Sequence, residues 1–229
     1  MHRNQILAAL VRRHPELQRN LTRRDFLSKD VVVRPGEPID HLIFPISGML
    51  AVAVEVDGDF VGTGMVGSEG LVGGTVVFGF EKHLNFIVGR VPGSAYLLAA
   101  EEIIRLAEHD ASIPRLLFAC EAWLGVQAQQ LSACNARHRI PERLSSWLLR
   151  AADAAGIDEL FVTQDAIADA LGVQRASVSN IAAEFQKAGW IAYKRGRITV
   201  IDRQALERRA CDCPKQLGAF QRTLFGTAD

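Results

Sequence analysis

The chain has 229 residues, and its 26 Lys and Arg residues are balanced by 26 Asp and Glu residues. This length allows one large domain or two modest ones, and no run of about 18 apolar residues indicates a membrane-spanning helix. Four cysteines in so long a chain do not suggest a disulfide framework. The basic N-terminal stretch is too broken by polar residues for a secretory signal. We therefore expect a cytoplasmic protein with no membrane partner.

The N-terminal part is rich in β-forming residues and turn signals. Residues 4–28 are predicted to form short helices, with Ile6 and Leu10 on one apolar face. Residues 30–98 contain short β-rich runs that alternate with glycine and proline, and Asp57-Gly58 is a strong hairpin turn. The pattern predicts a small β-barrel or sandwich, followed by a short helix over residues 101–110.

A long helix is predicted from Ser112 to His138. Along it, mostly apolar residues recur at alternating intervals of four and three, as in a coiled-coil seam with one polar position. An ordinary amphipathic helix packs on its own domain. A helix that joins two domains and carries a strict seam at 3.5-residue intervals more often pairs with the same helix of a second chain. We therefore predict a homodimer whose seam consists of Ile113, Leu117, Cys120, Leu124, Gln127, Leu131 and Cys134.

The best domain boundary follows this helix. Pro141 is tolerated in the first turn of the next helix, in which Leu144, Trp147 and Leu148 face a core. The hinge is therefore predicted near Arg139-Ile140-Pro141.

Two short helices and a hairpin are predicted between Thr163 and Ile201. Thr163 can cap the first helix, Gly172 allows the turn, and Gly189 is placed to end the second helix. Gly196 then lies between two β-forming runs, which is a hairpin signal. This order is typical of a winged helix-turn-helix, which places its second helix in the DNA major groove. The alternative is an ordinary helical pair with a hairpin and no DNA partner.

Charge is unevenly distributed along the balanced chain. Residues 1–111 hold 11 basic and 14 acidic residues, residues 112–139 hold 3 and 1, and residues 140–229 hold 12 and 11. Within the last part, residues 174–209 hold 8 basic residues against 3 acidic ones. A charge run is usually a solvated face, but this one coincides with the second helix and the hairpin. Phosphate binding needs such a local patch more than a basic chain.

The order of β-rich domain, long helix and winged helix-turn-helix resembles the CRP/FNR superfamily of bacterial transcription regulators, which includes the cyclic-AMP receptor protein. The most specific segments are TQDAIADALGVQRASVSNIAAEF at 163–185, YKRGRITVID at 193–202, Arg34–Glu37 and Ser47-Gly48.

The resemblance covers nearly the whole chain and implies an α+β fold with three parts. These are a cyclic-nucleotide-binding-like β-roll (a double-stranded β-helix) over 1–111, a dimerisation helix over 112–139 and a winged helix-turn-helix domain over 140–229. The partners that it implies are double-stranded DNA, a second copy of the chain, RNA polymerase and a small-molecule effector.

The second helix of the motif carries the predicted DNA contacts. Arg175 can donate both arms to the O6/N7 edge of guanine, and it matches a DNA-reading Arg of the cyclic-AMP regulator. That regulator carries Glu where this chain has Ala176 and a second Arg where it has Asn180, so we expect a different operator. The predicted base contacts are Gln174, Arg175, Ser177 and Asn180, and the predicted phosphate contacts are Thr163, Gln164, Ser179, Lys187, Arg195 and Arg197.

The effector is left open by the sequence. Nucleotide-binding members of the family use a Gly-Glu pair for the ribose and an Arg followed by Ser or Thr for the cyclic phosphate. Here Ser68 precedes Glu69, and Lys82, His83 and Arg90 lack a following Ser or Thr. We therefore predict that cyclic AMP does not bind in the usual way. The candidate effector pocket is a nest of N–H groups for another anion, or else a tight turn with glycine at positive φ, formed by Gly67, Ser68, Glu69 and Gly70.

The cysteines do not have the spacing of a metal site. Cys120 is the first in the chain, so the N-terminal cluster of the family's oxygen sensor is missing. Cys120 and Cys134 fall on the seam, where Cys behaves as a small apolar residue. Cys211 and Cys213 supply two thiolates at most, whereas four ligands are the norm for zinc or iron–sulfur. We therefore expect no metal and no haem.

No Ser/His/Asp, paired-carboxylate or P-loop arrangement appears in the sequence, so we expect no enzymatic activity. The alternative to a DNA-binding regulator is a ligand-binding or scaffold module that does not bind DNA. Such a module uses the β-roll alone and leaves the basic hairpin unexplained. Salt-dependent, sequence-selective DNA binding by the dimer distinguishes the two.

Overall fold

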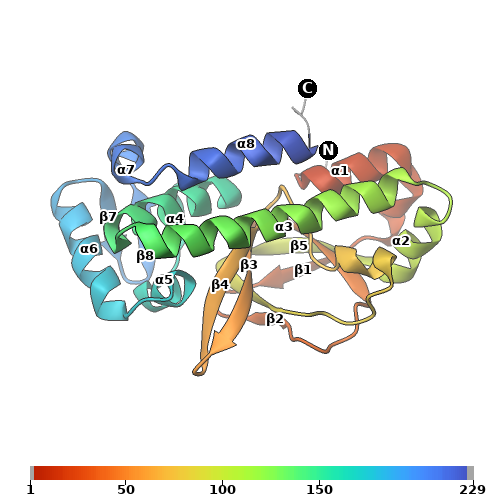
Figure 1. Cartoon of the computed structure of the whole chain (residues 1–229), viewed down its shortest axis with the longest axis horizontal. Helices are drawn as coiled ribbons and strands as arrows, with labels where there is room; N and C mark the ends of the chain where they lie inside the picture. The colour runs from red at the N-terminus through yellow and green to blue at the C-terminus, as the bar shows by residue number, and fades with distance from the viewer. Residues whose placement is uncertain (1–2, 226–229) are drawn as a thin grey trace.

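The computed structural model describes residues 3–225, and its longest helix, α3 (Ser112–Arg137), runs along the molecule (Figure 1). The N-terminal part contains α1 (Gln5–Arg13), η1 (Pro15–Asn20), β1 (Thr22–Phe26), β2 (Val31–Val33), β3 (His41–Val56), β4 (Asp59–Val66), η2 (Gly74–Phe78), β5 (Phe86–Ala99) and α2 (Ala100–Ala107). The C-terminal part contains α4 (Ile140–Ala155), β6 (Glu159–Phe161), α5 (Gln164–Leu171), α6 (Arg175–Lys187), β7 (Ile191–Lys194), β8 (Arg197–Val200), α7 (Arg203–Arg209) and α8 (Cys213–Phe225). The predicted α+β class is confirmed. Among the described residues, no helix combines the length and the apolar character needed to cross a membrane.

The N-terminal sheet is antiparallel, with the strand order β1-β5-β3-β4 and with β2 paired to β5. The long strands β3 and β5 pair over most of their length, and register shifts between them allow the sheet to bend. Gly48 at φ +70° is required at this bend, because a Cβ there would lie 2.4 Å from the carbonyl oxygen of Pro92. Asp57 and Gly58 form the predicted hairpin between β3 and β4, both at positive φ.

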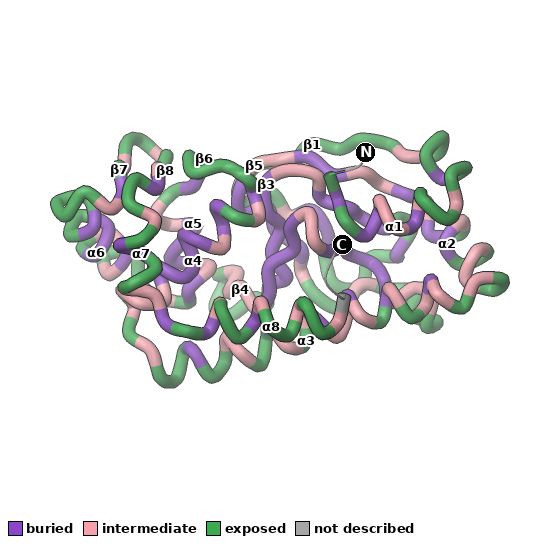
Figure 2. The backbone as a smooth tube through the Cα atoms, turned by 90° about the horizontal axis from the view of Figure 1, so that it is seen from above, coloured by how far each residue is buried: buried purple, intermediate pink, exposed green. Residues whose placement is uncertain are grey.

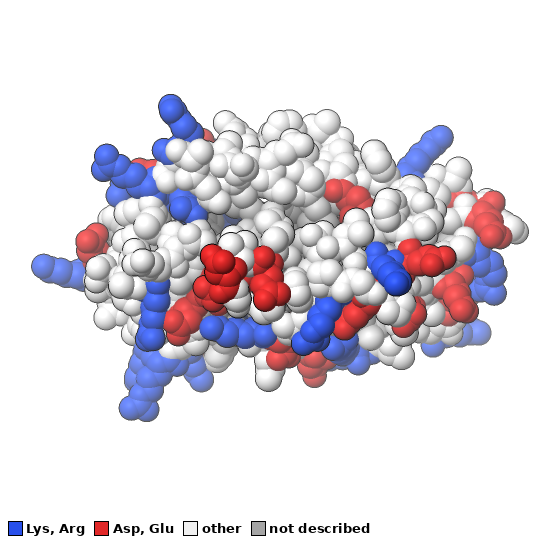
Figure 3. Space-filling view, turned by 60° about the horizontal axis from the view of Figure 1, so that its bottom comes forward, with Lys and Arg blue, Asp and Glu red and all other residues white. Residues whose placement is uncertain are grey.

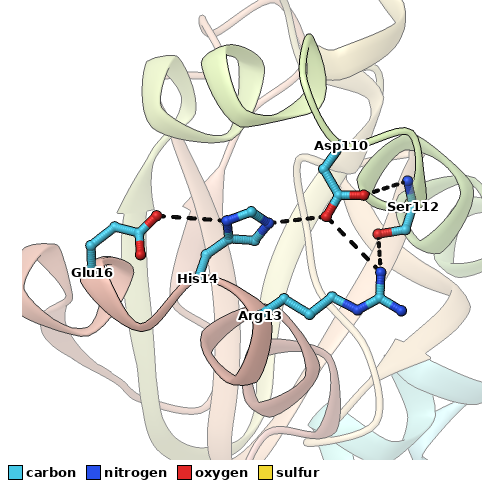
Figure 4. Close-up of polar contacts among 5 residues, drawn as sticks. All are labelled: Arg13, His14, Glu16, Asp110 and Ser112. Carbon is cyan, nitrogen blue, oxygen red and sulfur yellow. Dashed lines mark hydrogen bonds and ion pairs between the residues drawn. The ribbon is translucent and has the colours of Figure 1, made fainter.

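Polar contacts between the N-terminal helices and the α2–α3 turn fix the start of α3 (Figure 4). His14 contacts two carboxylates, with Nε2 3.0 Å from Asp110 and Nδ1 3.6 Å from Glu16. Asp110 accepts the backbone N–H of Ser112 at 2.8 Å, and the guanidinium of Arg13 donates to the Ser112 hydroxyl. The bonds from Ser112 and His14 hold the pKa of Asp110 well below its usual range. The carboxylate therefore stays charged beside the N-terminal end of α3, where it accepts the first N–H of the helix.

The C-terminal part is the predicted winged helix-turn-helix. Thr163 caps α5 by accepting the N–H of Ala166 at 3.2 Å, and Gly172 ends the helix at φ +61°. A three-stranded sheet of order β6-β8-β7 forms the wing. The wing turns at Arg195 and Gly196, which both have positive φ, as a two-residue hairpin with the twist of its strands requires.

One hydrophobic cluster spans the two parts. Trp147 and Leu148 of α4 are buried in a cluster that includes Met49 and Met65 of the N-terminal sheet. Figure 2 shows buried stretches in both parts of the molecule, including β3 and α4. The last helix, α8, lies along α3 (Figure 1). This helix was not predicted from the sequence.

The segment between α3 and α4 is short. α3 ends at Arg137, α4 begins at Ile140, and the Glu142 carboxylate accepts the N–H of Arg139 at 2.9 Å to cap α4. The division of the chain at residues 111/112 and 139/140 into separate functional units stays a prediction.

Candidate DNA-binding surface and sensor cavity

Helix α6 presents its first turns to solvent and buries its opposite face. Val178, Ile181 and Phe185 pack into the C-terminal core, as their spacing predicts. Of the four predicted base contacts, three are exposed and one is half-buried, and all lie in the first half of α6 or at its N-cap: Gln174, Arg175, Ser177 and Asn180. This face of α6 is exposed to solvent and is accessible to the major groove of DNA.

Arg175 is already engaged in an ion pair. Its Nε lies 3.3 Å from Oδ1 of Asp165, which belongs to the first turn of α5. Both side chains are largely exposed, so the pair contributes little to stability and can open. The pair keeps the guanidinium at the N-terminal end of α6.

Three of the predicted phosphate contacts hold the motif together. Thr163 is the cap of α5, and the Ser179 hydroxyl donates to Oε1 of Gln164. The second bond joins the two helices of the motif and fixes their angle. Contact of these three groups with phosphate stays a prediction.

The other predicted phosphate contacts lie on α6 and the wing. Arg197 pairs with Glu159 at 3.4 Å and lies 4.6 Å above the ring of Phe161, so its charge is partly satisfied. Lys187 and Arg195 are exposed. Figure 3 shows Lys and Arg side chains projecting from the left end of the molecule, where α6 lies, and acidic side chains nearer its middle. The positive charge therefore projects where the sequence predicts DNA.

The predicted coiled-coil seam faces the protein itself and not solvent. Its N-terminal half packs into the core of the β domain, and its last residue packs against the C-terminal segment. In this structure the seam is therefore not available to a second chain, which corrects the prediction for these positions. The residues concerned are Ile113, Leu117, Cys120, Leu124, Gln127, Leu131 and Cys134, of which only Leu124 and Leu131 are half-buried and the rest are buried.

The opposite face of α3 is the exposed one. Phe118 is 63% exposed, and Ala122, Gly125, Gln129 and Ser132 follow it at intervals of four and three residues. Apart from Phe118 and Gln129 these residues are small. A second helix can approach closely along such a stripe.

Gln127 bridges α3 to β4 and α4. Its Oε1 accepts the N–H of Met65 at 3.1 Å and a bond from Arg150 at 2.6 Å, and its Nε2 donates to the carbonyl of Met65 at 3.0 Å. The side chain is fully buried. The polar position of the predicted seam thus serves an internal contact.

A cavity of about 420 Å³ lies between the sheet and the middle of α3. Its walls come from the sheet and the segments beside it (Val52, Thr63, Gly64, Val72, Gly73, Thr75, His83, Leu84, Asn85 and Ile87) and from α3 (Glu121, Leu124, Gly125 and Ala128). Among the residues that the structure describes, no Lys or Arg lines this cavity. Burial lowers the pKa of His83 despite the nearby Glu37 and Asp40, so its imidazole is neutral at pH 7.

Glu121 is the ionisable group on the α3 side of the cavity. Burial raises its pKa to about 7, partly offset by the bond that it accepts from the backbone of Gly74. The carboxyl therefore changes charge near neutral pH. A cavity with neutral His83 and titrating Glu121 has no group that would neutralise a cyclic phosphate.

The predicted effector pocket at residues 67–70 lies elsewhere. Glu69 folds back so that its own carboxylate accepts the N–H of Gly67 at 3.0 Å, and the carbonyl of Ser68 accepts a bond from Gln5. The Glu69 carboxylate thus occupies one N–H of the predicted anion nest, and the N–H of Gly70 donates to the carbonyl of Gly67. Neither Gly67 nor Gly70 has positive φ, so the alternative of a left-handed glycine turn is also wrong. The tight packing of Gly67 against Ala154 of α4 explains the glycine, because a Cβ there would lie 2.9 Å from the Ala154 methyl.

Arg90 points away from the cavity and toward the DNA-binding part. Its side chain is 1% exposed, donates to the carbonyl of Phe60 and lies 4.0 Å from Asp169 of α5. Lys29 also pairs with Asp169, at 3.5 Å. Burial lowers the pKa of Arg90, and Asp169 partly offsets this. The β domain thus holds an acidic residue of the first DNA-motif helix.

Three of the four cysteines converge at the end of α3, which was not predicted from the sequence. Cys134, Cys211 and Cys213 are buried together, and His138 joins them. Cys134 is 77 residues from Cys211 in the chain, so no local motif reveals the cluster. The i, i+4 spacing of Cys134 in α3 and His138 at its C-cap was the available signal.

Comparisons with known proteins agree with this architecture. Residues 142–209 match the family described as the Crp-like helix-turn-helix domain. A CRP-family transcriptional regulator from Thermus thermophilus superposes with a TM-score of 0.67 at 21% identity, covering 82% of this chain and 96% of that one. FixK2 from Bradyrhizobium japonicum gives 0.70 at 17% identity, covering 83% and 98%. The c-di-GMP-responsive regulator CLP from Xanthomonas campestris gives 0.62 at 19%, covering 84% and 98%. A comparison with curated protein sequences finds no match.

The chain therefore carries a Crp-like helix-turn-helix domain on the CRP/FNR fold. The resemblance predicted from the sequence is confirmed. Residues 142–209 thus match the Crp-like helix-turn-helix family, and the chain shares the fold of solved CRP/FNR-family regulators.

Proposed function

We propose that the protein is a homodimeric, sequence-specific transcription regulator that reads a near-palindromic operator and recruits or contacts RNA polymerase. The observation that carries this proposal is the free N-terminal face of α6, flanked by exposed Lys187 and Arg195. Arg175 reads guanine, and Asn180 prefers adenine. Two copies related by a two-fold axis place their recognition helices on half-sites about one helical turn apart.

An Arg175→Ala variant is expected to bind the operator about 10- to 100-fold more weakly, because a bidentate guanine contact is worth roughly 1–3 kcal/mol. The measurement is a fluorescence-anisotropy titration at fixed salt, with an operator selected from a random duplex library by the wild-type protein. Arg12→Ala is the matched control, since Arg12 is exposed on α1 at the far end of the molecule (Figure 1). We expect the control to bind like the wild type. Equal affinity of Arg175→Ala and wild type for the operator contradicts the assignment.

Dimerisation is proposed through the exposed face of α3. Because the predicted seam is buried within the chain, the stripe of Phe118, Ala122, Gly125, Gln129 and Ser132 is the surface left for a partner helix. Phe118 adds an exposed aromatic contact, with its ring centroid 6.1 Å from that of Phe78. An exposed large aromatic beside small residues favours close pairing of two helices.

A Phe118→Glu/Gln129→Glu variant is expected to be monomeric, because each substitution places like charges opposite one another across the two-fold axis. Light scattering after size exclusion measures the mass, and we expect the wild type at twice the mass of one chain. Leu27→Glu is the control, since Leu27 is 64% exposed between β1 and β2 and is not part of the α3 stripe. A variant that remains dimeric shows that pairing uses another surface.

The cavity beside α3 is proposed as the effector site. Without a guanidinium, and with Glu121 in its wall, it suits an uncharged or cationic small molecule better than a cyclic nucleotide. β4 connects this site to the DNA-binding part. Thr63 and Gly64 line the cavity, and a Cβ at Gly62 would lie 3.3 Å from the carbonyl of Ala170 in α5. A ligand that moves β4 therefore acts directly on the helix-turn-helix.

A further inference from the structure

Four side chains with metal-binding atoms meet where α3 ends and the C-terminal segment begins. Cys134 and the C-cap residue His138 lie one helical turn apart at the end of α3. Cys211 lies between α7 and α8, and Cys213 is the first residue of α8. Their Sγ atoms and a ring nitrogen of His138 all lie within 4.8 Å of one another. The three thiols are at most 9% exposed.

Two of the six distances among these four atoms match the edges of a coordination tetrahedron, and all six are at most 4.8 Å. The Sγ atoms of Cys134 and Cys211 are 3.7 Å apart, and Sγ of Cys213 is 3.6 Å from Nδ1 of His138. With zinc bonds of ~2.3 Å to sulfur and ~2.0 Å to nitrogen, a regular tetrahedron has edges of ~3.8 Å between two sulfurs and ~3.5 Å between sulfur and nitrogen. An ion at the centre would reach all four atoms after small side-chain rotations.

We propose that Cys134, His138, Cys211 and Cys213 bind one tetrahedral Zn²⁺ ion. Three thiolates and one imidazole form a closed Cys3His set of the kind found in structural zinc sites. An iron–sulfur cluster occupies the space between its ligands and needs them farther apart than these atoms lie. The reading of each Cys as a small apolar residue explains burial, but it does not explain why three thiols and an imidazole nitrogen converge on one point.

The surroundings suit the negative charge of such a site. The Ser146 hydroxyl lies 3.2 Å from Sγ of Cys211, at hydrogen-bond distance for a sulfur ligand. Arg143 and Arg150 line the same hollow as the three cysteines. Three thiolates, one neutral imidazole and Zn²⁺ carry a net charge of −1, which one guanidinium balances.

The ion would fix the C-terminal helix to the hinge. Two ligands precede Arg139, where α3 turns into α4, and the other two immediately precede or begin α8. Zinc would therefore hold α8 against α3 and hold the winged domain at a set angle to the long helix. This couples metal occupancy to the geometry of the α3–α4 junction, independently of DNA or effector binding.

The full-length wild-type chain provides the first test. We expect reduced protein stripped by a chelator to take up about one Co²⁺ per chain, with the visible bands of tetrahedral cobalt and a thiolate-to-cobalt charge-transfer band in the near ultraviolet. Zn²⁺ should displace the cobalt, and it should raise the Tm of the stripped protein. Absence of these bands overturns the proposal. So does a purified protein that contains iron with inorganic sulfide, or a Cys134–Cys211 disulfide that forms in place of metal uptake.

Two pairs of variants give the second test. Cys211→Ser and His138→Ala should each weaken Co²⁺ binding at least about 10-fold, with a loss of charge-transfer intensity for the cysteine variant. Cys120→Ala and His109→Ala are the matched controls, since Cys120 is buried in the β-domain core and His109 is exposed before α3. Circular dichroism establishes that each variant is folded. The assignment of ligands is overturned if the two ligand variants and the two controls lose Co²⁺ binding equally. It is also overturned if all four of these proteins retain it.

Discussion

A Gln127→Leu variant is expected to lose about 3 kcal/mol of the free energy of unfolding. The amide of Gln127 makes three hydrogen bonds, two with the backbone of Met65 and one with the guanidinium of Arg150. Leucine has nearly the same volume but leaves these buried groups without partners. Each unsatisfied buried group costs roughly 1–3 kcal/mol, and partial relaxation reduces the sum.

The measurement is urea unfolding of wild type and variant at one protein concentration, because dimerisation adds to apparent stability. Gln18→Leu is the matched control, since Gln18 is exposed in η1, and its effect should stay within about 0.5 kcal/mol. If Gln127→Leu unfolds at the same urea concentration as the wild type, the bridge between α3, β4 and α4 is not the stabilising contact that we describe.

Raising the pH from 5 to 8 is expected to destabilise the wild type through Glu121. Burial raises the pKa of this carboxyl in the folded protein to about 7, from an ordinary value of 4.5. A raised folded-state pKa means that the native state holds the proton more tightly. Stability from this group is therefore full below pH ~4.5 and is lost as the pH rises through ~7. Complete loss amounts to at most about 3 kcal/mol.

A Glu121→Gln variant should remove most of this pH dependence and should be more stable than the wild type at pH 8. Unfolding curves at pH 5, 6, 7 and 8 give the slope for each protein. Glu108→Gln is the control, because Glu108 is exposed at the end of α2 and its substitution should leave the slope unchanged. Parallel pH profiles of wild type and Glu121→Gln would show that the carboxyl titrates as a solvated group.

Local chemistry allowed the DNA-binding part to be predicted in detail. Thr163 as a cap, Gly172 at the turn and Gly196 in the wing each act within a few residues of their own position. The same holds for the Asp57-Gly58 hairpin. Such signals depend on φ angles and backbone hydrogen bonds, so the sequence carries them directly.

The orientation of α3 is not determined by its sequence pattern. A stripe at intervals of three and four residues marks one buried face, but a partner helix and a chain's own domain bury such a stripe equally well. The exposed stripe of Phe118, Ala122 and Gly125 has the same spacing. Only tertiary structure distinguishes the two faces.

Long-range juxtaposition is the other feature that sequence reasoning missed. Cys134 and Cys211 are distant in the chain, and nothing local to either predicts their contact. The prediction for residues 67–70 was wrong for the same reason, because Gly67 is explained by the packing of α4 against it. Predicting either requires knowing where α4 and α8 lie.

The ion pair between Arg175 and Asp165 has a consequence for the speed of target search. A guanine edge can replace the carboxylate as the partner of Arg175, but a random sequence often offers none. On such DNA we expect the guanidinium to remain with Asp165 for part of the time, so that Arg175 adds little to the affinity. The protein would then have a short residence time on random DNA. Its residence time would be longer at sites where a guanine replaces Asp165 as the partner of Arg175.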